Sequence, residues 1–231
     1  MSEKKNLAWW NEYFSDTKGW EGHGGRVQSK LFAEAFVTRL TKKHNDSFSL
    51  LDAGCALGDA IKVIASHYPN AQLTGFDFSE AAISQCKLEM PDIAEFNVGN
   101  LNDVMDNEYD VIFCSNTLEH FPDFELKARN LALRCSILCV MVPYNELVDG
   151  QYISPNENEH HQNTFLENSF NYLIEEGIAV KISTEIFSCP GAWGWTGWNA
   201  SVQFLKNILR PIIKKKRVVR PYQIYYEIQI K

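Results

Sequence analysis

The feature that most constrains this chain is an apolar segment that breaks into a glycine-containing turn and continues as a helix-forming segment. Residues 48–51 are apolar except for Ser49, the turn reads DAGCALG over residues 52–58, and residues 60–65 carry helix formers. A glycine turn between a strand and a helix presents bare backbone amides to a ligand. The pattern predicts an α/β unit with a site for a nucleotide-like ligand, the alternative being a strand-to-helix turn that binds nothing.

The spacing of the glycines separates two kinds of nucleotide ligand. A dinucleotide fingerprint requires glycine at its first, third and sixth positions, which here hold Gly54, Ala56 and Asp59. An NAD-dependent reductase therefore fits poorly. The pattern Asp52-x-Gly54-x-x-x-Gly58 instead resembles the first motif of the class I S-adenosylmethionine-dependent methyltransferases, with Ala56 in the place of a common middle glycine. We expect alanine to be tolerated there provided that its backbone does not need a positive φ.

Polar residues also follow the next two predicted strands. Residues 71–76 form the second strand and end at Asp77, where a carboxylate is placed to accept hydrogen bonds from two ribose hydroxyls. Asp77-Phe78-Ser79 resembles the second motif of the family, although Asp77 as a simple helix cap is the alternative. A third strand over residues 93–98 leads to Asn100, where the family usually has an acid on the adenine amine. Asn100 keeps an acceptor oxygen but lacks the charge, and its alternative role is in a turn.

The fourth predicted strand, residues 109–114, is followed by the run SNTLEHFPD over residues 115–123. This run resembles the small-molecule branch of the family, in which Leu-Glu-His follows strand four. Ligands of open α/β sheets bind outside the carboxyl ends of the strands, so the glycine turn and Asn116 are predicted to line one crevice. The resemblance covers residues 48–186.

The resemblance implies S-adenosyl-L-methionine as the cofactor and assigns residues to its parts. Asp52, Gly54 and Gly58 are expected at the methionine end, Asp77 at the ribose, Asn100 and Leu101 at the adenine, and Asn116 beneath the sulfur. Cys55, Ala56 and Phe78 are expected to contact the cofactor as well.

Strands and helices alternate as far as a fifth strand over residues 136–142, which predicts an α/β fold with a parallel sheet and helices on both faces. A helix is predicted over residues 164–176, a sixth strand over 178–187 and a seventh over 222–230. The resemblance implies a Rossmann-like seven-stranded, mostly parallel sheet of order 3-2-1-4-5-7-6, with strand 7 antiparallel. The length of 231 residues favours one domain, 1–231, with substrate-side insertions at 143–163 and 188–221.

Residues 1–45 are predicted to form an aromatic-rich lid followed by a docking helix. The aromatic residues before the helix are Trp9, Trp10, Tyr13, Phe14 and Trp20. Such a segment can close over a site and exclude water. Arg26, at the start of the helix, is the candidate for holding the cofactor carboxylate, because a guanidinium matches that group bidentately. The alternative is a solvated arginine.

Three histidines are candidates for a general base, a role that histidine suits near neutral pH. His120 follows strand four, and His160 with His161 precede the predicted helix over 164–176, where small-molecule relatives also carry histidine. The alternatives are packing beside the cofactor for His120 and polar loop positions for the other two. The spacing of these residues and Glu159 does not by itself predict a metal site.

The composition of the chain limits the classes of partner that we expect it to bind. The net charge of −7 argues against a nucleic-acid binder, and the chain has no apolar run of membrane-spanning length and no apolar signal core near Met1. We therefore expect a cytoplasmic protein. Residues 214–217 and 220 are basic and follow an apolar segment, which is typical of weak contact with an anionic membrane or a phosphate-bearing substrate, or of a solvated basic face.

The sequence thus predicts a methyltransferase that transfers the methyl group of S-adenosylmethionine to an oxygen, or less readily a nitrogen, of a small metabolite, sugar or lipid-linked intermediate. A non-catalytic S-adenosylmethionine-binding partner or sensor protein is the alternative from another class.

Overall fold

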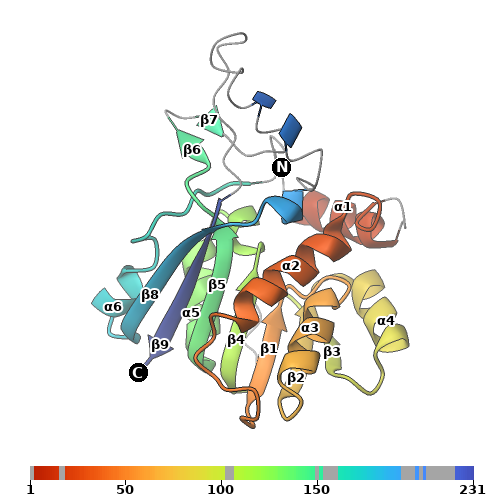
Figure 1. The fold of residues 1–231 in the computed structure, drawn as a ribbon, viewed down its shortest axis with the longest axis horizontal. Coiled ribbons are helices and arrows are strands. Elements are labelled where there is room, and N and C mark those ends of the chain that lie inside the picture. The colour runs from red at the N-terminus through yellow and green to blue at the C-terminus, as the bar shows by residue number, and fades with distance from the viewer. Residues whose placement is uncertain are drawn as a thin grey trace.

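A seven-stranded sheet forms the centre of the molecule (Figure 1). The computed structural model describes residues 3–15, 19–101, 107–148, 151–152, 161–193, 201–202, 205–206 and 222–231. The strands are β1 (Ser49–Ala53), β2 (Gln72–Asp77), β3 (Glu95–Val98), β4 (Tyr109–Ser115), β5 (Cys135–Pro143), β8 (Ala179–Ser188) and β9 (Tyr222–Ile230). Their order is β3-β2-β1-β4-β5-β9-β8, and β9 is antiparallel to both of its neighbours. The predicted α/β fold and strand order are confirmed.

Helices cover both faces of this sheet, so the middle of β4 is apolar on both faces. On β4, Val111 and Phe113 face one hydrophobic cluster while Ile112 and Cys114 face the other, and all four are fully buried. This follows from the alternation of side chains along a strand. The first cluster lies under α2 (Gly25–Val37), α3 (Asp59–His67) and α4 (Glu80–Glu89), and the second under α5 (Phe124–Ala132) (Figure 1).

The predicted helix over residues 164–176 is wrong for most of its length. Only α6 (Tyr172–Glu175) is helical, and Phe165 instead forms an isolated bridge with Tyr144. Phe165 and Phe170 are both fully buried and stack with ring centroids 5.9 Å apart. Five positions apart on a helix, the two rings would point to different faces, so burying both requires an irregular backbone.

The connections that were expected to be substrate-side insertions are described only in part. The first contains a small hairpin of β6 (Leu147–Val148) and β7 (Gln151–Tyr152), which the sequence analysis did not anticipate. The second is described as far as η2 (Pro190–Trp193) and at four later residues. The basic residues 214–220 lie outside the described part of the chain. Within the described ranges, no helix combines the length and the apolar character needed to cross a bilayer.

Candidate functional site

A pocket of about 1040 Å³ opens at the carboxyl ends of β1, β2 and β4. The predicted site residues that line it are Asp52, Gly54, Cys55, Ala56, Asp77, Phe78, Asn100, Leu101, Asn116, His120 and His161. They come from five separate segments of the chain. Parallel strands place their carboxyl ends at one sheet edge, which explains why residues so distant in sequence meet there.

The glycine turn is held in an unusual backbone conformation by the end of β2. Gly54 and Gly58 have φ values of 89° and 71°, in the left-handed region that favours glycine. The backbone N–H groups of Gly54 and Cys55 both donate to the carbonyl oxygen of Phe76, at 2.8 and 3.0 Å. Gly58, which was predicted to contact the cofactor, lies outside the pocket lining. A Cβ at this position would meet Met90 Cε at 2.4 Å. Its role is close packing of α3 against α4.

Ala56 does not meet the condition under which alanine was expected to be tolerated. Its φ is 48°, so the middle position of the turn does need a positive φ. The conformation is held by a hydrogen bond of 2.9 Å from the Ala56 N–H to Oδ2 of Asp77. A non-glycine residue in this region costs about 1–2 kcal/mol, and the turn carries that strain at the pocket wall.

Replacing Ala56 with glycine is expected to raise the free energy of unfolding by up to about 1 kcal/mol. The relief of left-handed strain exceeds the extra chain entropy that glycine loses on folding, which is about 0.5–1 kcal/mol. Urea unfolding of the wild type and Ala56→Gly, with midpoints compared at equal slope, measures the change. A clear loss of stability would show that the Ala56 methyl group contributes packing that outweighs its strain.

Asp77 joins the first two motifs through both of its carboxylate oxygens. Oδ2 accepts from Ala56 N–H, and Oδ1 accepts from Ser79 N–H at 2.9 Å. Burial raises the pKa of Asp77 to about 6, against the backbone N–H groups that lower it. The cap of α4 is Ser79 itself, whose Oγ accepts from Ala82 N–H. A carboxylate has about four acceptor sites, so Asp77 retains acceptor capacity for a ligand.

Asp52 is a buried carboxylate whose Oδ2 has no hydrogen-bond partner among the described residues. Burial, together with the nearby charge of Asp77, raises the pKa of Asp52 to about 7. A buried polar atom without a partner is costly, so one that lines a pocket indicates a ligand that supplies a donor or a positive charge.

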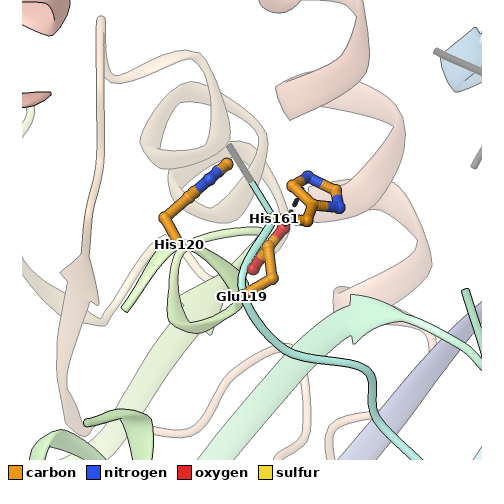
Figure 2. A group of neighbouring side chains, drawn as sticks. All are labelled: Glu119, His120 and His161. Atoms are coloured by element: carbon orange, nitrogen blue, oxygen red, sulfur yellow. Dashed lines mark ion pairs between the residues drawn. The ribbon is translucent and has the colours of Figure 1, made fainter. Parts of the chain in front are cut away.

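A cluster of acidic and imidazole groups forms another wall of the pocket (Figure 2). Glu119 and His120 lie in η1 (Leu118–His120), directly after β4, and His161 is brought to them by a hydrogen bond of 2.8 Å from Gln162 N–H to the Glu119 carbonyl. His161 Nδ1 and Glu146 Oε2 are 2.6 Å apart. Burial raises the pKa of Glu119 to about 7, while the nearby His161 lowers it in part. Sequence reasoning missed Glu146, because only folding brings residues 146 and 161 together.

The aromatic residues of α1 (Glu3–Ser15) also line the pocket, as do Trp20 and His23. The Trp10 ring lies 5.4 Å from the His120 ring, measured between centroids. Asn11 Oδ1 accepts a hydrogen bond of 2.7 Å from Ser79 Oγ at the start of α4. The N-terminal helix therefore contacts both the expected cofactor side of the pocket and the histidine cluster.

Three of the predicted site residues are not placed in the pocket: Gly58, described above, Arg26 and His160. Arg26 is absent from the described lining, and its guanidinium lies 3.2 Å from Asp59 Oδ2 and 2.9 Å from Glu89 Oε1. These carboxylates hold Arg26 between α2, α3 and α4, so the structure does not support its predicted contact with a cofactor carboxylate. His160 lies outside the described residues.

Comparison with known proteins shows that the chain is similar to methyltransferases. Residues 51–136 match the family described as "Methyltransferase domain". The chain is 29% identical over 101 residues to trans-aconitate 2-methyltransferase of Escherichia coli O1:K1 and 28% identical over 104 residues to malonyl-[acyl-carrier protein] O-methyltransferase of Bacillus cytotoxicus. These alignments cover 42% and 43% of this chain, and 40% and 36% of the relatives, so the chain spans less than half of their length.

A solved structure is similar over most of the chain. Coclaurine N-methyltransferase bound to N-methylheliamine and S-adenosylhomocysteine superposes with a TM-score of 0.61 at 14% identity, covering 88% of this chain and 72% of that protein. At this identity the likeness establishes the fold. The resemblance to class I methyltransferases is thereby confirmed, by the family match over residues 51–136 and by the fold.

Proposed function

We propose that this chain, whose residues 51–136 match the methyltransferase-domain family, binds S-adenosylmethionine and transfers its methyl group to an oxygen of a small molecule. The observation that carries the proposal is the convergence of the glycine turn, Asp77 and Asn116 on one pocket. The relatives and the similar solved structure, which is named as holding S-adenosylhomocysteine, support this choice of cofactor. The O-methyltransferase among the relatives supports oxygen as the acceptor atom.

The pocket residues fit this cofactor. Oδ2 of Asp52, which has no hydrogen-bond partner in the described part of the chain, suits the ammonium of the methionine end, and Asp77 has acceptor capacity for the ribose hydroxyls. Gly54 lets the backbone approach closely, because a Cβ there would lie 2.4 Å from Thr117 Oγ1. Asn100 and Leu101 line the part of the pocket assigned to adenine. Asn116, which has a φ of 48°, lines the part assigned to the sulfur.

When bound, S-adenosylmethionine supplies an electrophilic methyl group on a sulfonium, so the protein must chiefly orient an acceptor and manage one proton. We assign the exclusion of water to the aromatic residues of α1. Glu119, His120 and His161 form the titratable part of the pocket wall, and we place the acceptor hydroxyl beside them. His120 and His161 line the pocket and are the proposed catalytic residues. His160 lies outside the described residues, so its catalytic role stays a prediction.

The proposed contact of Asp52 with the cofactor predicts a pH dependence of binding. A free-state pKa of about 7 means that Asp52 is largely protonated at about pH 6, whereas the ammonium of S-adenosylhomocysteine favours the carboxylate. Binding below neutral pH then releases a proton, so affinity rises with pH. Between about pH 6 and about pH 7.5 we expect an increase of about 10-fold for the wild type.

The matched variant is Asp52→Asn, which removes this titration and keeps the shape. Asp77, with a pKa of about 6, still titrates, so we expect a residual change of about 2-fold over the same range. Calorimetric titration at several pH values measures both. An equal pH dependence in wild type and Asp52→Asn would exclude Asp52 from the cofactor site.

The proposed function is tested by binding and by transfer, measured separately. Titration of the full chain with S-adenosylhomocysteine should give saturable heat and a rise in Tm. Transfer of a labelled methyl group is then screened over hydroxyl-bearing and amine-bearing small molecules, including carboxylic acids, sugars and phenols. Absence of binding would refute the proposal, and binding without transfer to any acceptor would favour the non-catalytic binding protein. Loss of transfer with retained binding in His120→Ala would place that histidine at the acceptor.

Other sequence-based expectations stay predictions. The cytoplasmic location, the one-domain division and the contact of residues 214–220 with an anionic membrane or phosphate-bearing substrate belong to this group. We infer a small-molecule acceptor from the relatives and from the size of the pocket.

A further inference from the structure

The orientation of His161 is fixed by a buried carboxylate. Glu146 Oε2 lies 2.6 Å from His161 Nδ1, a hydrogen-bond distance, and both side chains are buried. With the proton on Nδ1, the lone pair of Nε2 points away from Glu146. Metal-binding histidines are commonly oriented by a carboxylate on the other ring nitrogen in this way.

The other ring nitrogen of His161 faces a second buried carboxylate at a longer distance. Its Nε2 lies 4.0 Å from Glu119 Oε1, which is too far for a hydrogen bond. Two metal–ligand bonds of about 2.0–2.2 Å each span a gap of this size. Glu119 is 1% exposed, and its Oε2 has no hydrogen-bond partner among the described residues.

His120 supplies a third ligand atom from the same short helix as Glu119. One ligand atom from each of Glu119, His120 and His161 lies within 4.8 Å of the others. Figure 2 shows Glu119 between the two histidines, with the dashed line from its carboxylate to His161. The rings of His120 and His161 lie 5.0 Å apart and are inclined by 70°, so they approach from different directions.

The charges of the cluster also favour a cation. Glu119 and Glu146 are both buried beside the imidazole of His161, and Glu146 Oε1 has no hydrogen-bond partner among the described residues. Even a protonated His161 balances only one of two ionised carboxylates. A buried negative charge is costly unless it is paired, and one divalent ion with neutral imidazoles would balance both.

We propose that Glu119, His120 and His161 bind one divalent first-row transition ion, such as Zn²⁺ or Mn²⁺, and that Glu146 is a positioning residue for His161. Two imidazole nitrogens and one carboxylate suit these ions, whereas Mg²⁺ and Ca²⁺ prefer sites built from oxygen. All three ligands line the pocket, so further coordination positions face the space assigned to the acceptor.

The consequence for catalysis rests on the proposed function. An ion at this place would bind the acceptor oxygen and lower the pKa of its hydroxyl. The O–H bond breaks, its proton passes to water, and the oxygen then forms the bond to the methyl carbon as the carbon–sulfur bond breaks. The acceptor class is therefore a hydroxyl-bearing small molecule that can reach the ion.

The test is metal binding by the full chain in the absence of cofactor. Protein freed of metal with a chelator is titrated calorimetrically with Zn²⁺ and with Mn²⁺, and we expect one tight site. Glu119→Gln and His161→Gln should each weaken that site by about 100-fold, and Glu146→Gln by about 10- to 100-fold. The control is the double variant His44→Gln with His67→Gln. The imidazole rings of these two histidines lie 5.8 Å apart and do not line the described pocket. This variant should bind the metal ion as the wild type does.

A spectroscopic measurement on the wild-type protein tests the same site without relying on the correct folding of any variant. Wild-type protein loaded with one equivalent of Cu²⁺ should show electron paramagnetic resonance couplings to two imidazole nitrogens. Absence of a tight site, coupling to no imidazole, or wild-type binding by both Glu119→Gln and His161→Gln would overturn the proposal. Titration with S-adenosylhomocysteine is run in parallel. If the protein binds S-adenosylhomocysteine but no metal ion, this inference alone is refuted. If it binds the metal ion but no S-adenosylhomocysteine, the proposed function alone is refuted.

Discussion

Asp77→Asn is expected to weaken the binding of S-adenosylhomocysteine by about 10- to 100-fold, because hydrogen bonds to a charged group contribute about 1.5–3 kcal/mol. The carboxylate accepts from Ala56 N–H through Oδ2 and from Ser79 N–H through Oδ1. An asparagine has one acceptor oxygen, so its amide nitrogen must face one of these backbone donors. The turn then loses its anchor to β2 at the same time as the proposed ribose acceptor loses its charge.

Asp110→Asn is the matched control for this substitution. Asp110 is exposed, and its Oδ2 alone accepts from Ser49 N–H and Ser49 Oγ, at 2.8 and 3.0 Å. An asparagine oxygen can accept both bonds. We expect calorimetric titration of Asp110→Asn to match the wild type, and a similar loss in both variants would show that the effect of Asp77 is not specific to the cofactor site.

Gly54→Ala is expected to lower the free energy of unfolding by about 2–5 kcal/mol, the sum of left-handed strain and overpacking, and to abolish measurable cofactor binding. The new Cβ would lie 2.4 Å from Thr117 Oγ1, and the φ of Gly54 is 89°. The turn between β1 and α3 must move to relieve the clash, which displaces the backbone that we assign to the methionine end. Urea unfolding and titration with S-adenosylhomocysteine measure the two effects.

Gly177→Ala separates the two causes. Gly177 has a φ of 71°, but a Cβ there would meet no atom within 4 Å. We expect Gly177→Ala to lose about 1–2 kcal/mol of stability through backbone strain and to bind the cofactor as wild type does. Adding Thr117→Ala to Gly54→Ala removes the two closest contacts and should recover part of the stability. If Gly54→Ala behaves like Gly177→Ala, close approach at Gly54 is unimportant for binding.

The parts of the fold predicted correctly are those with a local signal. The apolar run of β1, the turn after it and the acid that ends β2 are each visible in a few consecutive residues. The limits of β9 agree with its predicted range because its polar and apolar residues alternate. The pocket follows from these elements, since parallel strands bring their carboxyl ends to one edge.

The predictions that were wrong or incomplete concern groups whose partners are distant in the sequence. Arg26 is placed by Asp59 and Glu89, residues on two other helices. Ala56 takes its positive φ in a turn anchored by Asp77 on the next strand. Phe165 lies in a predicted helix, but its side chain is buried in the core and its backbone is not helical.

The order of apolar runs, glycines and acids along the chain determined the α/β fold and where its ligand pocket forms, because strand alternation and turn geometry depend on neighbouring residues. Tertiary structure alone decided which charges meet in that pocket. Glu119, Glu146 and His161 come from three separate segments, and their distances and burial arise only when the connection after β5 folds back over η1. Electrostatic energies depend on separation in space and on exclusion of water, neither of which spacing along the sequence specifies.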